Sequence, residues 1–157
     1  MSPKSLLVEQ FSATFDKEGW FVPLTTALDG LSATDAAWRD SSANHSVWQI
    51  VNHIYFWNDR YFYRFKGTPR PSIEIDNNTT FEGENENWQA DKDRLTSMMN
   101  EWRTLIQAAD DSKFDEEFME GRTETWASVL ADINVHTAYH VGQILYVRKQ
   151  MGKWIPA

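Results

Sequence analysis

Four long stretches of the chain repeat apolar residues at helical spacing, and no stretch alternates apolar and polar residues as a half-buried strand would. A chain of 157 residues favours a single domain, covering 1–157. Four amphipathic helices in one domain predict an all-α fold, a four-helix bundle. The expected helices span 4–28, 47–66, 88–109 and 125–151.

Proline and capping residues mark where these helices should begin and end. Pro23 is expected to kink or break the first helix near Val22. Ser46 suits the N-cap of the second helix. An unusually long polar connection, 67–86, follows the second helix, and an acidic linker, 110–124, precedes the fourth. The long connection leaves room for a crossover, so the helices need not simply alternate up and down.

Charge and composition exclude several classes of function. A net charge of −8 argues against nucleic acid and against an anionic membrane surface as partners, since both need clustered Lys and Arg. No segment approaches the roughly 18 apolar residues of a membrane-spanning helix. Glu9, Asp16 and Glu18 lie where a secretory signal would be apolar, so we expect a cytoplasmic protein. The lack of cysteine excludes disulfides and cysteine ligands.

Three of the four histidines occupy positions that can converge in a helical core. His136 and His140 are four residues apart in an apolar stripe, so they share a helix face, roughly 5–6 Å apart at Cβ. His53 lies at the margin of another apolar face. Two such imidazoles suit one metal ion, and a third from a facing helix would leave open coordination positions, as catalytic metal sites do. The alternative is a set of core histidines hydrogen-bonded to their neighbours.

Other motifs for metals and nucleophiles are absent from the sequence. Thr137 follows His136, so there is no HExxH motif with its general base. No glutamate stands three residues before any histidine, which argues against a ferritin-like di-iron centre. There is no glycine-rich phosphate loop and no GxSxG motif. The sequence therefore assigns no general acid, general base or protein nucleophile.

Two further residues are candidates for a substrate pocket beside the histidines. Trp57 follows His53 by one turn, and Gln143 lies beside the stripe of the fourth helix, so both should border the open coordination position. The alternative is that Trp57 fills core and Gln143 only bonds a polar neighbour. His45 precedes the second helix and is expected in a loop. We expect the site towards one end of the bundle, within reach of the 67–86 connection.

Two sequence segments resemble a known family. SVWQIVNHIYFWNDRYFYRF, residues 46–65, resembles the second-helix pattern of the DinB/YfiT-like superfamily of metal-dependent enzymes. HTAYHVGQILYVRKQMG, residues 136–152, resembles its fourth-helix pattern. The resemblance covers nearly the whole chain. It implies an up-down-down-up order of helices and a divalent metal, nickel or zinc, held by His53, His136 and His140.

The resemblance also implies a class of reaction, because characterised relatives include transferases and isomerases that use thiols such as bacillithiol or mycothiol. We expect a metal-dependent enzyme with a small-molecule substrate, either an S-transferase for a low-molecular-weight thiol of the bacillithiol type or a hydrolase. The alternative is a non-catalytic metal- or small-ligand-binding bundle, and a third possibility is a structural dimer with packed histidines. The aromatic content of 14% favours a homodimer, since one core need not bury it all.

Overall fold

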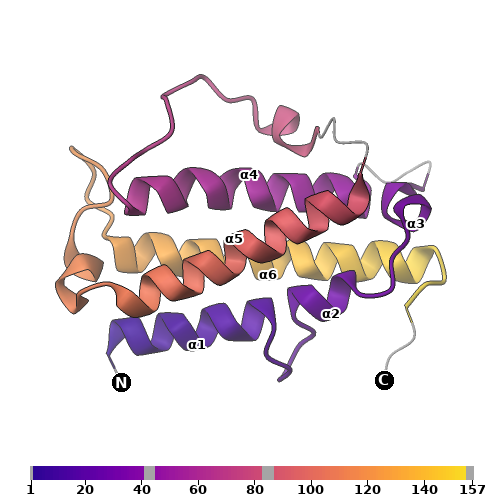
Figure 1. The fold of residues 1–157 in the computed structure, drawn as a ribbon, viewed down its shortest axis with the longest axis horizontal. Helices are drawn as coiled ribbons and strands as arrows, with labels where there is room; N and C mark the ends of the chain where they lie inside the picture. The colour runs from indigo at the N-terminus through magenta and orange to yellow at the C-terminus, as the bar shows by residue number, and fades with distance from the viewer. Residues whose placement is uncertain (1, 41–44, 83–86, 155–157) are drawn as a thin grey trace.

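The computed structural model describes residues 2–40, 45–82 and 87–154, and these residues form helices and connections with no strand among them (Figure 1). Four helices are long, as the sequence predicts: α1 (Pro3–Phe15), α4 (Val47–Phe65), α5 (Trp88–Ala108) and α6 (Trp126–Gln150). Short helices lie in the connections: α2 (Leu24–Leu28), α3 (Ala33–Ala37) and the 3-10 helices η1 (Asn77–Phe81) and η2 (Asp111–Asp115).

The four long helices form a bundle with a crossover. Each of α1 and α4 packs on both α5 and α6, so α1 and α4 occupy opposite corners. In Figure 1, α4 and α5 run in the same direction, opposite to α1 and α6, which is the expected up-down-down-up order. Parallel neighbours need a long return, and the connection from α4 to α5 supplies it. Its helix η1 packs on α4.

Short polar side chains fix where the helices that carry the histidines begin. Ser46 caps α4 by accepting from the backbone N–H of Gln49, whose side chain accepts from the N–H of Ser46 in return. Thr125 caps α6 by accepting from the N–H of Ser128. Because both starts are fixed, each histidine lies at a defined height in the bundle.

The first helix is shorter than the sequence predicts. It ends at Phe15 rather than near Val22, and Pro23 is the N-cap of α2 instead of a kink. Asp16 forms the C-cap of α1, and both of its carboxylate oxygens accept from Arg103 of α5 at 2.8 Å. The chain turns away after this ion pair, and α2 then packs on α6.

Aromatic side chains from α4, α5 and α6 interlock in the core. Trp102 of α5 is fully buried and meets Phe62 and Phe65 of α4 edge to face, with ring centroids 5.2 and 5.6 Å apart. Phe65 also packs edge to face on Trp126 of α6 at 4.9 Å. The indole N–H of Trp102 donates to the backbone oxygen of Asn58 at 3.2 Å. These contacts hold α4 against both of its neighbours.

Other large apolar side chains are exposed. They include Trp20, Phe21, Val135, Tyr139 and Tyr146. The core thus absorbs much of the aromatic content without burying all of it, and the homodimer stays a prediction. Among the described helices, none is both long enough and apolar enough to span a membrane.

Replacing Trp102 with Ala should lower the free energy of unfolding by about 3–5 kcal/mol, because it opens a cavity among three helices and removes the bond to Asn58. Urea unfolding followed by circular dichroism measures the loss. Trp20→Ala is the matched control, since that indole is fully exposed and its loss should change stability by less than about 0.5 kcal/mol. Similar losses of stability in both variants would contradict the buried packing of Trp102 between the helices.

Candidate metal centre

Three imidazole rings converge where α4 faces α6. His53 comes from the second turn of α4, and His136 and His140 come from adjacent turns of α6. The Nε2 atom of His136 lies 3.1 Å from the Nε2 atoms of both other histidines. One ring nitrogen from each residue lies within 4.8 Å of the others. The structure therefore brings together the three histidines that the sequence singles out.

Hydrogen bonds on the far side of two rings determine which nitrogen carries the proton. The Nδ1 of His140 lies 2.7 Å from Oε1 of Gln143, whose Nε2 donates to the hydroxyl of Tyr139. The Nδ1 of His53 lies 2.5 Å from the hydroxyl of Thr80, which already donates its own proton to a backbone carbonyl. Both partners must accept, so both Nδ1 atoms are protonated and both Nε2 atoms present bare lone pairs.

The protein environment favours neutral imidazoles. Burial, followed by repulsion from the neighbouring histidines, lowers the pKa of His53 to about 3. Burial, followed by repulsion from His136, lowers the pKa of His140 to about 4. Burial also lowers the pKa of His136. Neutral imidazole is the form of histidine that binds a metal ion, so the site is prepared for one at neutral pH.

The donor set fits a divalent transition metal. The Nε2 lone pairs of His53 and His140 both point towards Nε2 of His136, which can donate at most one proton to them. At least one lone pair therefore faces another nitrogen without a proton between them, and a cation bound by all three nitrogens removes that repulsion. Imidazole is a ligand for zinc, copper, iron and nickel, and three such ligands leave coordination positions open.

A stacked aromatic ring separates the fourth histidine from the cluster. The ring of Phe81 stacks on His53 at 3.9 Å on one side and on His45 at 3.7 Å on the other. His45 lies before the first residue of α4, as expected. Its ring does not belong to the group of converging nitrogens found among the described residues. Phe81 covers one face of the His53 ring and excludes water from it.

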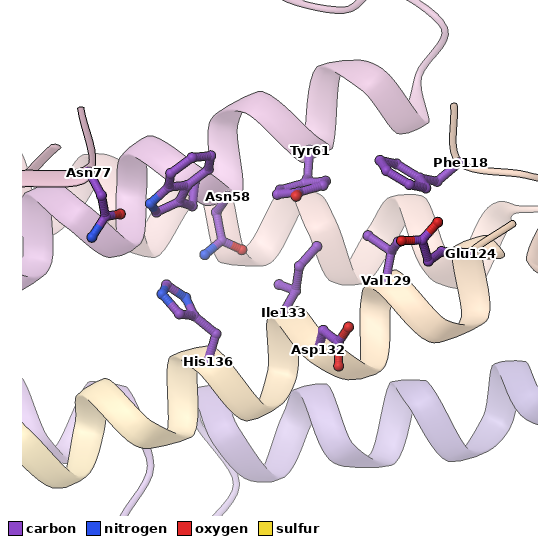
Figure 2. Close-up of a pocket in the computed structure, with 10 residues that line it drawn as sticks. Asn58, Tyr61, Asn77, Phe118, Glu124, Val129, Asp132, Ile133 and His136 are labelled. Atoms are coloured by element: carbon purple, nitrogen blue, oxygen red, sulfur yellow. The ribbon is translucent and has the colours of Figure 1, made fainter. Parts of the chain in front are cut away.

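A cavity of about 380 Å³ opens beside His136, between α4 and α6 (Figure 2). Trp57, Asn58 and Tyr61 line it from α4, and Ile133 lines it from α6. A ligand in this cavity can contact the exposed edge of the histidine cluster, so the cavity is the candidate substrate pocket.

Sequence reasoning located some of the supporting residues. Trp57 lines the cavity together with His136, whereas Gln143 lies outside the residues that line it and orients His140 instead. Thr80 and Phe81 were missed, because nothing in the pattern of a polar connection says which of its residues returns to the site. Asn58 was missed as a pocket residue, although an amide on an otherwise apolar helix face was the available signal.

Comparison with known proteins places this arrangement in a family. The chain resembles a solved structure whose title reads "YfiT from Bacillus subtilis is a probable metal-dependent hydrolase with an unusual four-helix bundle topology". The identity is 18%, the TM-score is 0.72, and the match covers 95% of this chain and 87% of that one. No curated protein matches the chain. The family model described as the DinB superfamily matches residues 23–144. With most of its length matched by that model, the chain belongs to the DinB superfamily.

Proposed function

We propose that this protein is a metal-dependent enzyme that transfers a low-molecular-weight thiol of the bacillithiol type to a small electrophilic substrate. Its divalent ion, nickel or zinc, is held by His53, His136 and His140. The observation that carries the proposal is the convergence of three neutral imidazoles whose lone pairs have no other common partner. Membership of the DinB superfamily supports the same ligand set.

Residues of the chain prepare the site for this chemistry. A divalent ion on three neutral ligands keeps its full charge and, when bound, lowers the pKa of a coordinated water or thiol. Gln143 and Thr80 fix the tautomers and orientations of His140 and His53. Phe81 keeps water from one face of the cluster, and the cavity beside His136 admits the substrate.

Two alternatives are supported by particular observations. Hydrolysis needs only water in place of the thiol, and the similar structure from Bacillus subtilis is named as a probable metal-dependent hydrolase. A non-catalytic metal-binding bundle is supported by the composition of the converging group, which contains histidines and no carboxylate among the described residues. Both alternatives use the same three histidines.

Thiol transfer is tested by turnover. Nickel- or zinc-loaded protein should conjugate bacillithiol to monochlorobimane, and His140→Ala should abolish the reaction because it removes one of three ligands. Hydrolysis of p-nitrophenyl acetate in the absence of thiol is the control reaction. If the protein hydrolyses the ester but does not conjugate the thiol, the proposed activity would be hydrolysis and not thiol transfer. Metal retention with neither reaction would favour the non-catalytic bundle.

Metal content is a separate prediction. We expect one divalent ion per chain, measured by inductively coupled plasma mass spectrometry after loading and dialysis. His53→Ala and His140→Ala should each lose tight binding and keep their helical content, because only three ligands converge in the part of the chain that the structure describes. His45→Ala should keep the metal, since Phe81 separates that ring from the cluster. Loss of metal in His45→Ala but not in His53→Ala would mean that the third ligand is misassigned.

The lowered histidine pKa values predict how the stability of the metal-free protein depends on pH. His53 and His140 take up protons near pH 6.5 when unfolded but only near pH 3 and pH 4 when folded. The unfolded state therefore binds more protons below pH 6.5, and each histidine should cost about 1.4 kcal/mol of stability per pH unit there. Their contribution is fully favourable above pH 6.5 and falls as the pH drops.

Urea unfolding of chelator-treated protein at pH 7.5, 6.5 and 5.5 measures this dependence. The double variant His53→Gln/His140→Gln is the control and should show a much shallower loss over the same range. Equal stability of the unsubstituted protein at pH 6.5 and 5.5 would contradict the buried, neutral state of the two imidazoles.

A further inference from the structure

The cavity beside His136 contains a buried hydrogen-bond acceptor with no partner. Asn58 is only 1% exposed, and its Nδ2 donates to the backbone oxygen of Ile54 at 2.9 Å. That bond fixes the amide, and the remaining atom, Oδ1, has no partner within residues 2–40, 45–82 and 87–154. Figure 2 shows the amide projecting from α4 towards α6. A buried acceptor without a donor is costly, which points to a ligand that carries an N–H or O–H group.

The same cavity carries negative charge. Glu124 and Asp132 line it, and neither belongs to any ion pair among the described residues. No lysine or arginine is among the described residues that line it. The cavity therefore offers acceptors and negative charge to a ligand.

One wall of the cavity is aromatic. The rings of Trp57 and Tyr61 lie one turn apart on α4, 6.4 Å between centroids, and Phe118 continues the row 6.3 Å beyond Tyr61. These faces suit an apolar or aromatic segment, and they also attract a cation. The wall thus leads from the histidine end of the cavity towards its acidic end (Figure 2).

The acidic end is held in place by the chain before α6. The backbone N–H of Phe118 donates to the backbone oxygen of Glu124 at 3.1 Å, and a bridge pairs Glu117 with Thr125. From His136 back to Trp126, the first residue of α6, the helix rises about 15 Å, and Glu124 lies just beyond. Asp132 lies one turn from His136. Asp132 therefore lies nearer the metal site than Glu124 does.

We propose that this cavity binds an elongated amine. The protonated amine lies at Glu124, and Asp132 adds negative charge between Glu124 and His136. An apolar or aromatic segment lies along Trp57, Tyr61 and Phe118, and an N–H or O–H group near the reacting end donates to Oδ1 of Asn58. The inference rests on the proposed function, because it names the class of substrate that reaches the histidines. It assigns Asn58 and the two carboxylates to substrate specificity.

Isothermal titration with matched probes tests the proposal. 4-Phenylbutylamine should bind the full-length protein about ten-fold more tightly than the neutral 4-phenylbutan-1-ol, because only the amine gains from the two carboxylates. The titrations are made on the protein as purified and again after metal removal by chelation. The preference should persist without metal, which separates charge recognition from coordination of the amine. Equal affinities for amine and alcohol would overturn the proposal.

Two kinds of variant identify the residues. The double variant Glu124→Gln/Asp132→Asn should bring the amine down to the affinity of the alcohol, whereas Glu101→Gln, an exposed charge on α5, should leave the preference unchanged. Asn58→Leu should weaken 4-(4-aminobutyl)phenol, whose phenol hydroxyl reaches the Asn58 end, more than 4-phenylbutylamine, which has no donor there. It should not lower the melting temperature, because it removes an unpaired buried acceptor. A double variant that keeps the preference for the amine would overturn the proposal. So would an Asn58→Leu protein that melts earlier and binds 4-(4-aminobutyl)phenol normally.

Failure of this proposal is distinguishable from failure of the proposed function. Metal content and bacillithiol conjugation are measured on the same protein preparations. A preference for the amine without metal binding or turnover removes the enzyme assignment and leaves the amine site. Turnover without any preference for the amine removes the amine site and leaves the enzyme.

Discussion

The chemistry of the site depends on three ring nitrogens that face one another where α4 meets α6. Two of these nitrogens are bare, because the other nitrogen of each ring keeps the proton and donates it in a hydrogen bond to Gln143 or Thr80. Without a bound cation, this cluster destabilises the folded state, because buried lone pairs that lack donors oppose folding. The aromatic core around Trp102 instead stabilises the position of α4, and it does so without contributions from the histidines.

The order of the helices and the chemistry of the site are connected. Because α4 and α5 run parallel, the chain must return along the length of the bundle between them. That return carries η1, whose Thr80 and Phe81 contact His53 and whose Asn77 lines the cavity. A bundle with short loops would leave the outer side of His53 open to water. The crossover thus provides the partner that fixes one tautomer and the ring that covers one ligand.

The sequence alone predicts most of the fold and the three converging histidines, for reasons that differ from one helix to the next. Helical spacing predicted the bounds of α4 and α6 within a residue or two, and Ser46 was predicted as the N-cap of α4, because capping is local chemistry. The spacing of His136 and His140 put both on one face for the same reason. The early end of α1 was not predicted, because it depends on the ion pair of Asp16 with Arg103, 87 residues away. Contacts of that range leave no periodic signal.

Asn58 shows how the core and the cavity share one helix. Its backbone oxygen accepts from Trp102, and its side chain faces the other way, towards α6. The residue therefore anchors α4 on one side and, on the other, leaves a buried acceptor without a partner among the described residues, at a position where a leucine would avoid that cost. A ligand that donates to Asn58 and a metal that joins the three imidazoles each satisfy groups that the folded chain leaves unpaired. Binding of either one should stabilise the fold, by an amount that rises with the logarithm of the ligand concentration once that concentration exceeds the dissociation constant, as mass action requires.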